Sequence, residues 1–348
     1  MNTNNWVLPL LHWYEHTKRD LPWRQTKDPY RIWVSEIMLQ QTRVETVIPY
    51  YERFLHTFPT VHDLAQSPLD QVLKAWEGLG YYSRAKNLHK AAQQIVQDYK
   101  GDFPQSYEAL RRLPGVGDYT VGALLSIAFN QPYPAIDGNV LRVLSRVYCI
   151  NEEISSLAVK KKMYQILKSL YPAGESSNFT QALMELGALV CIATSPRCHS
   201  CPITPFCIAQ KKKMQSDLPI KKKGAKKKAI ARSLALIQEE NKVLLHQRPL
   251  EGLLGGLWEF PGIDGDSDSD RFFQEHGFKI LWGAPSMTVR HEFTHLIWDM
   301  TLYKAQKVEP LSPLTERWHW FTVEELSEIT IPSAFRKIVQ SLKNENGL

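Results

Sequence analysis

Four cysteines in one short stretch have the clearest chemical potential in this chain. They lie in CIATSPRCHSCPITPFC, from Cys191 to Cys207, with six, two and five residues between successive cysteines. Four such thiolates can bind zinc or an iron–sulfur cluster. Structural zinc sites usually join two close cysteine pairs across a longer insertion, whereas one loop carries all four cysteines here. The spacing therefore favours a [4Fe–4S] cluster held by Cys191, Cys198, Cys201 and Cys207, with zinc as the alternative.

Two carboxylates have neighbours that suit acid–base and electrostatic roles. Glu36 lies in DPYRIWVSEIMLQQT, where Ile32 and Leu39 fall on the same face of an expected helix that begins at Pro29. Apolar surroundings raise the pKa of a carboxyl group, as a general acid requires; a surface glutamate is the alternative. Asp137, in YPAIDGNVLRV, is expected to cap the following helix, and at the mouth of a cleft it would also face a developing cation.

A third signal is the glycine-containing stretch LPGVGDYTVG, which predicts a tight turn followed by a helix from about Asp118. Gly115 and Gly117 permit backbone conformations that other residues rarely adopt. The backbone N–H groups around Val116 and Gly117 would then point outward at a helix start, where they suit a phosphate oxygen. An ordinary corner between two helices is the alternative.

The elements that must position these residues change in type along the chain. Amphipathic helical patterns separated by proline and glycine turns come first, and short strands follow a lysine-rich run. We expect a hairpin of 233–237 and 243–246, a solvated loop at 263–270, a strand at 293–303 and a closing helix in SAFRKIVQSL. The predicted domains are an all-α domain at 1–210 with its hairpin at about 108–129 and its cysteine loop at 191–207, a linker at 211–229, and a mixed α/β domain at 230–348.

Composition indicates an ordinary globular protein rather than a membrane or secreted one. The 348 residues are 43% hydrophobic and 22% charged, and no apolar run approaches the roughly 20 residues that span a bilayer. No signal peptide is evident at the N-terminus, so we expect a cytoplasmic protein whose thiols stay reduced. Disulfides among the clustered cysteines are therefore not expected, and Cys149, in the apolar stretch RVYCI, is expected in the core.

The positive charge of the chain is confined to one segment. Residues 211–228 hold nine lysines and one aspartate, a local charge of +8, against a net charge of +6 for the whole chain. Such a run is either a solvated linker or a binding segment for a polyanion.

Taken together, the hairpin, the aspartate after it and the cysteine loop resemble those of the helix–hairpin–helix DNA glycosylases that carry a [4Fe–4S] cluster. The endonuclease III type, a glycosylase/lyase for oxidised pyrimidines, has a lysine nucleophile after the hairpin, where this chain has Tyr119. The stretch SEIMLQQT and the C-terminal stretches LLGGLWEFPG and RWHWFTVEEL instead resemble the adenine DNA glycosylases with their MutT-like (Nudix-like) domain. A Nudix hydrolase is disfavoured because no glutamate-rich Mg²⁺-binding helix follows LWEFPG, and a DNA-binding protein without catalysis would leave Glu36 and Asp137 without a role.

The resemblance implies a monofunctional enzyme of base excision repair that acts, as a monomer bound to DNA of the nucleoid, on adenine paired with 8-oxoguanine or guanine. The base would be flipped out of the duplex, protonated by Glu36, and released while Asp137 stabilises the sugar cation. Tyr119 and Asn139 match positions that support Asp137 and the reaction intermediate.

The remaining implied residues fall into three groups, each carried over by matching position. The adenine pocket would contain Arg19, Trp23, Arg24 and Gln181. Contacts to DNA would come from Gln41, Thr42, Leu79, Tyr81, Gly115, Val116 and Gly117. The 8-oxoguanine sensor would be Phe293, Thr294 and His295, where the threonine replaces the usual serine and keeps its hydroxyl.

Overall fold

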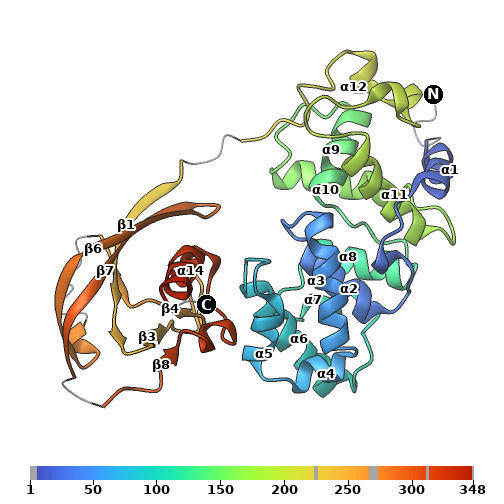
Figure 1. Cartoon of the computed structure of the whole chain (residues 1–348). Helices are drawn as coiled ribbons and strands as arrows, with labels where there is room; N and C mark the ends of the chain where they lie inside the picture. Colours follow the sequence, from blue (N-terminus) through green and yellow to red (C-terminus); the bar gives the residue numbers. More distant parts are fainter. Residues whose placement is uncertain (1–5, 223–225, 266–272, 311–312, 347–348) are drawn as a thin grey trace. The chain divides into compact units, whose positions relative to one another are not determined.

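A computed structural model describes the chain except for residues 1–5, 223–225, 266–272, 311–312 and 347–348. It contains two compact units, Met1–Gln66 with Asn87–Lys223, and Ser67–Lys86 with Gly224–Leu348. Helices make up the chain before the lysine-rich segment, and strands dominate after it (Figure 1). The predicted combination of an all-α part and a mixed α/β part is therefore confirmed.

Short helices follow one another before the cysteine loop. The N-terminal helices are α1 (Val7–Thr17), α2 (Pro29–Leu39), α3 (Val44–Thr57), α4 (Val61–Gln66), α5 (Leu69–Trp76) and α6 (Ser83–Tyr99), with a 3₁₀ turn at Pro22–Arg24. The hairpin and the helices after it are α7 (Tyr107–Arg111), α8 (Asp118–Ala123), α9 (Gly138–Val147), α10 (Leu157–Lys168), α11 (Ser176–Leu189) and α12 (Ile208–Lys211).

The predicted helix of Glu36 is present as α2. Asp28 caps it by accepting a hydrogen bond from the Tyr30 N–H at 2.9 Å, and Pro29 occupies its first turn, where a missing N–H costs nothing. This start sets the rotation of the helix, so that Ile32 and Glu36 both face the interior.

The glycine turn joins α7 to α8, as predicted. Gly115 has a φ of +73°, and a Cβ there would lie 2.6 Å from the Cβ of Asn87, so both the conformation and the close approach require glycine. Val116 corrects one expectation: its N–H donates to the Leu113 carbonyl at 3.2 Å and its side chain is buried, so that N–H does not point outward. After α8 the chain continues as a π-helix, Leu124–Ala128.

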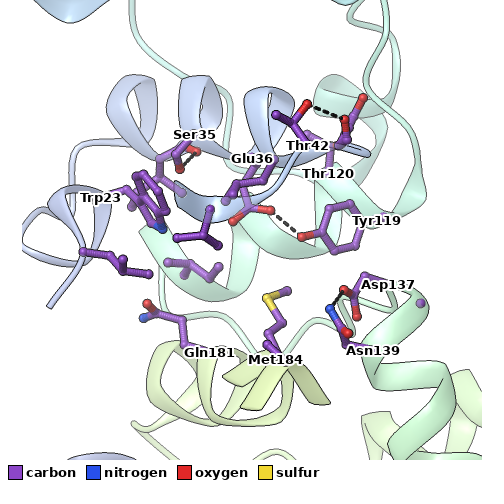
Figure 2. A pocket seen from close by; sticks show the side chains of 18 of the residues that line it. Trp23, Ser35, Glu36, Thr42, Tyr119, Thr120, Asp137, Asn139, Gln181 and Met184 are labelled. Carbon is purple, nitrogen blue, oxygen red and sulfur yellow. Dashed lines mark hydrogen bonds between the residues drawn. The ribbon is translucent and has the colours of Figure 1, made fainter. Parts of the chain in front are cut away.

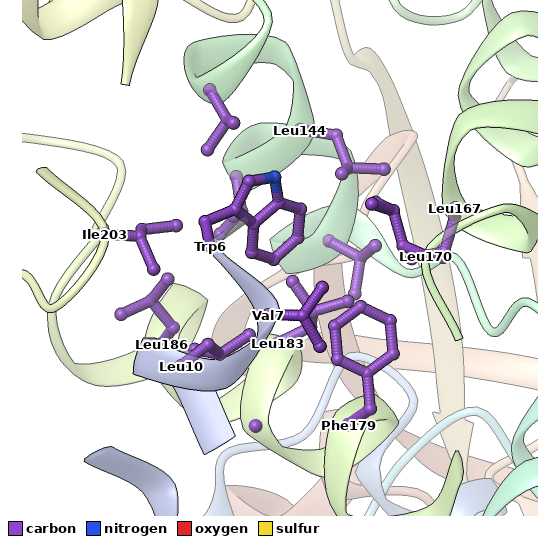
Figure 3. Packing of buried hydrophobic residues seen from close by; sticks show 14 of the residues in the cluster. Trp6, Val7, Leu10, Leu144, Leu167, Leu170, Phe179, Leu183, Leu186 and Ile203 are labelled. Carbon is purple, nitrogen blue, oxygen red and sulfur yellow. The ribbon is translucent and has the colours of Figure 1, made fainter. Parts of the chain in front are cut away.

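A core of large apolar side chains connects α1, α9, α10 and α11. Trp6 is fully buried, and its ring centroid lies 5.9 Å from that of Phe179 (Figure 3). Phe179 in turn meets the Tyr171 ring edge-on at 5.1 Å. This packing fixes α9 against α11, the two helices that carry much of the site described below.

The second unit contains two four-stranded sheets. Its strands are β1 (Lys228–Leu236), β2 (Gln238–Glu239), β3 (Lys242–Gln247), β4 (Trp258–Glu259), β5 (Gly262–Asp264), β6 (Phe278–Glu292), β7 (Leu296–Pro310) and β8 (Trp318–Thr322). One sheet has the order β5-β1-β7-β6, and the other has the order β2-β3-β4 with β8 paired to β3. Helix α14 (Arg336–Glu345) packs its apolar face against residues of both sheets (Figure 1).

Several expectations for this unit need correction. The hairpin expected of 233–237 and 243–246 is present only at its turn end, where β2 pairs with β3 and the Leu244 N–H donates to the Ile237 carbonyl at 3.0 Å. Residues 233–236 instead belong to β1, which pairs with β5 and β7. The strand expected at 293–303 begins at Leu296, since the preceding residues form the turn after β6. The loop expected at 263–270 starts within β5, and its residues 266–270 lie outside the described part of the chain. The closing helix is confirmed as α14.

The lysine-rich segment 211–229 is not uniformly solvated. Leu218 is 2% exposed, and its carbonyl accepts a hydrogen bond from Arg146 at 2.9 Å. Ile220 accepts a backbone hydrogen bond from Ile154 at 3.1 Å, and Lys228 already begins β1. Cys149 is likewise only half-buried, with a φ of +49° at the end of α9, and is not a core residue.

The described residues contain no helix that combines the length and the apolar character needed to cross a bilayer.

Replacement of Phe179 by alanine tests the packing of α11. Removing a fully buried aromatic ring should lower the free energy of unfolding by about 3–5 kcal/mol, because the contacts with Trp6 and Tyr171 are lost and a cavity remains. Urea denaturation followed by the helical circular dichroism signal measures the change. Leu8→Ala, at a side chain 71% exposed, is the matched control and should have little effect. Similar losses for both variants would contradict this account of the core.

Candidate active site

A cavity of about 720 Å³ lies among α2, α8, α9 and α11 (Figure 2). Twelve of the residues expected from the sequence line it: Arg19, Trp23, Arg24, Glu36, Gln41, Thr42, Gly115, Gly117, Tyr119, Asp137, Asn139 and Gln181. Residues as far apart in the chain as Arg19 and Gln181 are thus brought to one place.

Glu36 is the acid on the α2 side of the cavity. Its side chain is 5% exposed, which confirms the predicted burial, and its carboxylate accepts a hydrogen bond from the Tyr119 hydroxyl on α8. Burial raises the pKa of Glu36 to about 7; the Tyr119 hydrogen bond opposes this rise, nearby Asp137 adds to it, and Arg24 opposes it. At neutral pH this carboxyl group therefore carries a proton for a large part of the time.

Asp137 lies across the cavity from Glu36 and caps α9, as predicted (Figure 2). One carboxylate oxygen accepts from the Val140 N–H at 2.7 Å, and the other accepts from the Asn139 amide at 2.7 Å. Burial raises the pKa of Asp137, whereas these hydrogen bonds oppose the rise because they stabilise the anion. The start of a helix also favours negative charge.

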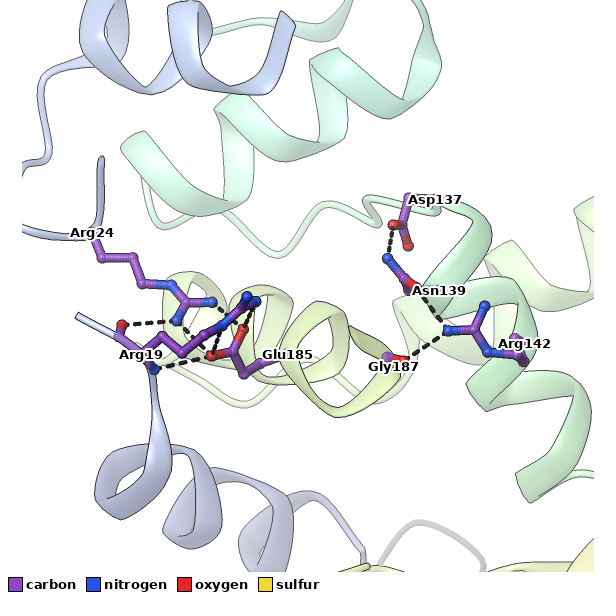
Figure 4. A network of polar contacts seen from close by, with 7 residues as sticks. All are labelled: Arg19, Arg24, Asp137, Asn139, Arg142, Glu185 and Gly187. Atoms are coloured by element: carbon purple, nitrogen blue, oxygen red, sulfur yellow. Dashed lines mark hydrogen bonds and ion pairs between the residues drawn. The ribbon is translucent and has the colours of Figure 1, made fainter. Parts of the chain in front are cut away.

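A third carboxylate, Glu185 on α11, is held by two arginines (Figure 4). Arg19 donates from its backbone N and from its Nε, both at 3.0 Å, and from Nη2 at 2.7 Å. Arg24 donates from its two Nη atoms at 2.9 and 2.7 Å. Burial raises the pKa of Glu185, but the bonds from Arg24 and Arg19 outweigh it and bring the pKa down to about 2. Glu185 is therefore charged at neutral pH.

Helix α9 links the cavity to the cysteine loop through Arg142 (Figure 4). The guanidinium donates to the Asn139 side-chain oxygen at 2.8 Å, to the Gly187 carbonyl at 2.7 Å and to the Cys191 carbonyl at 2.7 Å. Because Asn139 in turn donates to Asp137, a continuous chain of hydrogen bonds runs from the cavity to the first cysteine.

The cysteine loop surrounds a space of its own. Cys191, Cys198, Cys201 and Cys207 all line one small cavity together with Arg146. Among the described residues, no three histidine, cysteine, aspartate or glutamate side chains converge closely enough to hold a single metal ion. Four cysteine side chains around one shared space are the ligand set that an iron–sulfur cluster or a tetrahedral zinc ion takes.

Arg146 supplies positive charge and donors to this loop. Its buried guanidinium donates to the Cys191 Sγ at 3.3 Å and to the Ile192 and Ala193 carbonyls at 2.7 and 3.0 Å. A cation at this place offsets part of the negative charge that four thiolates bring together.

The loop that carries Leu79 and Tyr81 has a fixed backbone between α5 and α6. Arg84 donates to the Leu79 and Gly80 carbonyls at 3.2 and 3.1 Å, and Trp76 donates to the Gly80 carbonyl at 3.2 Å. Tyr81 has a φ of +50° and is 45% exposed, whereas Leu79 is buried.

In the second unit, the FTH triplet forms the turn between β6 and β7. The Phe293 N–H donates to the Leu296 carbonyl at 2.8 Å, and the Phe293 ring packs edge-on against Trp298 at 4.8 Å. Thr294 and His295 are exposed at the tip of this turn. The Phe293 ring therefore anchors the turn, the Thr294 hydroxyl hydrogen-bonds the Tyr81 hydroxyl, and the His295 side chain is exposed.

Sequence reasoning missed Glu185, Arg142 and Arg146. Glu185 follows Gln181 by four residues, so both fall on one face of α11, and its charge within ALMELGAL is a signal for a buried ion pair. Arg142 follows Asn139 by three residues on α9, and Arg146 follows by another four. Helical spacing from the expected site residues would have found all three.

The three carboxyl groups give the cavity a specific chemical capacity. Glu36, with a pKa of about 7, faces the hydrogen-bonded carboxylate of Asp137. Such a pair can protonate a leaving group on one side and stabilise a cation on the other. This combination suits cleavage of a glycosidic bond.

Comparison with known proteins agrees with this chemistry. Residues 34–170 match the HhH-GPD superfamily of base excision DNA repair proteins, and residues 233–341 match the NUDIX domain family. A thermostable thymine-DNA glycosylase has a similar structure, with a TM-score of 0.56 and 29% identity over 60% of this chain and 97% of that one. An endonuclease III–DNA complex has the same fold, with a TM-score of 0.51 and 24% identity over 60% of this chain and 95% of that one.

Relatives that match nearly the whole chain identify its enzyme family more narrowly. The adenine DNA glycosylase of Buchnera aphidicola subsp. Baizongia pistaciae is 35% identical, covering 99% of both chains. The adenine DNA glycosylase of Homo sapiens is 33% identical, covering 94% of this chain and 72% of the human one. The chain therefore belongs to the adenine DNA glycosylase family and is a DNA N-glycosylase, a hydrolase of base excision repair.

Proposed function

We propose that this enzyme removes adenine paired with 8-oxoguanine, or with guanine, from duplex DNA, and leaves an abasic site without cutting the strand. The observation that carries the proposal is the buried Glu36, with a pKa of about 7, facing Asp137 across one cavity. A base stacked in a duplex cannot reach such a cavity, so the adenosine must be flipped out of the helix at a cost of a few kcal/mol.

In the proposed reaction, protonated Glu36 donates its proton to N7 of adenine. The C1′–N9 bond then breaks with its electron pair moving to the base, so adenine leaves as a neutral molecule. The oxocarbenium-like sugar that remains is stabilised by the carboxylate of Asp137, which Asn139 orients by its hydrogen bond. A water molecule adds to C1′, and its proton returns to the Glu36 carboxylate. One water is consumed for each adenine released.

A monofunctional reaction is favoured over the glycosylase/lyase alternative. A lyase of the endonuclease III type needs an amine to form a Schiff base. Residues 118–128, DYTVGALLSIA, contain no lysine, and position 119 instead holds the tyrosine that bonds Glu36.

The supporting groups are proposed as follows. Cys191, Cys198, Cys201 and Cys207 hold a [4Fe–4S] cluster that fixes their loop and does not break bonds. Arg19, Trp23, Arg24 and Gln181 bound the adenine pocket. Gln41, Thr42, Leu79, Tyr81 and the hairpin glycines Gly115 and Gly117 contact the DNA. The exposed turn of Phe293, Thr294 and His295 senses 8-oxoguanine.

The first test is base release from labelled duplexes that contain A:8-oxoguanine, A:G, A:C or thymine glycol, each with and without alkali. We expect alkali-dependent cleavage of the first two, and a loss of roughly 10²–10⁴-fold in rate for Glu36→Gln because the acid is gone. Glu15→Gln, an exposed carboxylate on α1, is the control and should keep the wild-type rate. Cleavage at thymine glycol without alkali would instead support the lyase alternative.

The Glu36–Tyr119 hydrogen bond predicts a pH dependence. The active form of Glu36 is protonated, so the single-turnover rate should fall as pH rises through its pKa of about 7. The Tyr119 hydroxyl stabilises the ionised carboxylate and so lowers this pKa. In Tyr119→Phe the pKa of Glu36 should rise, and the alkaline limb of the rate profile should move to higher pH. A limb that stays in place or moves to lower pH would contradict the acid role.

The Thr294 hydroxyl is expected to contribute to lesion recognition. Thr294→Ser keeps the hydroxyl and should preserve the ratio of the rates on A:8-oxoguanine and A:G duplexes. Thr294→Val keeps the shape but loses the hydroxyl, and it should reduce this ratio about tenfold, which is the contribution of one hydrogen bond. Single-turnover rates on the two duplexes give the ratio. Equal ratios in all three proteins would remove the hydroxyl from the specificity argument.

A further inference from the structure

Glu185 has a more extensive set of partners than any role in packing requires. Its carboxylate is 1% exposed and receives five hydrogen bonds from Arg19 and Arg24, all between 2.7 and 3.0 Å. Arg24 also donates to the Arg19 carbonyl at 3.0 Å, so the two arginines are fixed to each other as well as to α11 (Figure 4). Both arginines and Glu185 line the same cavity as Glu36.

We propose that Glu185 is a positioning residue that holds Arg19 and Arg24 away from Glu36 and cancels part of their charge, so that Glu36 keeps its proton. The proposal rests on the proposed role of Glu36 as the acid. Glu185 touches neither Glu36 nor, in the proposed reaction, the base, and it acts only through the arginines.

The charges around the cavity give the direction of this effect. Glu36 is faced by Tyr119 from α8, by Asp137 before α9 and by Arg24 from the 3₁₀ turn. Of these, Asp137 favours the protonated form of Glu36, whereas Arg24 and the Tyr119 hydroxyl favour the ionised form. An arginine that moved closer to Glu36, or that lost its counter-charge, would therefore take the proton from the acid.

The surroundings of Glu185 and the arginines keep these cations in place. Arg24 lies over the Tyr14 ring of α1, with its Cζ 5.4 Å from the ring centroid. Lys18 lies near the same ring at 5.6 Å, and Glu45 of α3 acts weakly on Arg19. Each Nη atom of Arg24 donates to Glu185, and Nη1 also donates to the Arg19 carbonyl, so loss of this carboxylate would leave the Nη2 donor in need of another acceptor. The Glu36 carboxylate, in the same cavity, would be such an acceptor.

This arrangement gives helix α11 two separate contributions to the pocket. Gln181 presents a neutral amide that lines the cavity, and Glu185, one turn later, presents an anion that the arginines enclose. Glu185 therefore lines the cavity already paired with both arginines.

The test is a direct titration of Glu36 in the full-length protein, with ¹³C-labelled glutamate carboxyl groups followed by NMR. The Glu36 signal is assigned by its absence in Glu36→Gln. In Glu185→Gln we expect the Glu36 midpoint to move to lower pH by about one pH unit, because a cation is released toward it. In Arg24→Gln it should move to higher pH, because a cation is removed. Glu152→Gln, at an exposed carboxylate paired with Lys162 at 3.4 Å, is the control and should leave it unchanged.

The Glu36 midpoint is expected to fall in Glu185→Gln and to rise in Arg24→Gln. General damage to the pocket would not shift the midpoint in opposite directions in the two variants. The double variant Glu185→Gln/Arg24→Gln should return the midpoint toward the wild-type value, since Arg24 is the cation that Glu185 restrains. If Glu185→Gln does not fold, the rise of the Glu36 midpoint expected for Arg24→Gln remains a test. A Glu36 midpoint that stays at its wild-type value in folded Glu185→Gln or folded Arg24→Gln overturns the proposal. The expected midpoints combined with no adenine release from A:8-oxoguanine duplexes would count against the proposed function alone.

Discussion

The structure depends on giving three nearby carboxyl groups different hydrogen-bond donors. Burial raises the pKa of each of them, so burial alone does not distinguish Glu36, Asp137 and Glu185. Their donors do. Glu36 receives a hydrogen bond from a neutral tyrosine hydroxyl, Asp137 receives a backbone N–H and an amide, and Glu185 receives two guanidinium groups. The charged guanidinium donors bring the pKa of Glu185 to about 2, whereas the single neutral hydroxyl leaves that of Glu36 at about 7.

Helix α9 connects the cavity to the cysteine loop through the hydrogen bonds that orient Asp137. The oxygens of Asp137 are oriented by Val140 and Asn139, and Asn139 is oriented by Arg142. Arg142 takes its position from the Gly187 and Cys191 carbonyls, so the end of α11 and the start of the loop set the geometry at the cavity. Any group that fixes the four cysteines therefore also fixes the acceptors that hold Arg142. In this way the cysteine loop contributes to the order of the site.

Local patterns predicted the individual elements well, and the contacts between distant elements poorly. The start of α2, the burial of Glu36 and the cap at Asp137 follow from residues within one or two turns, and all three are confirmed. The pairing of β1 depends on β7, more than sixty residues away, and for that reason the expected hairpin of 233–237 with 243–246 forms only at its turn end. Arg19 and Glu185 are likewise far apart in sequence, and nothing local to either residue identifies the other as its partner.

Asp137 illustrates why sequence alone left two interpretations open for one residue. As a helix cap it needs an extended backbone, one carboxylate oxygen on the Val140 N–H, and negative charge at the start of α9. As a stabiliser of a cation it needs to be ionised, oriented and close to the reacting sugar. The capping interactions orient the carboxylate and favour its ionised form, against the effect of burial. The structural and the chemical roles therefore use the same hydrogen bonds, and only the cavity, with Glu36 on its opposite side, distinguishes this cap from any other.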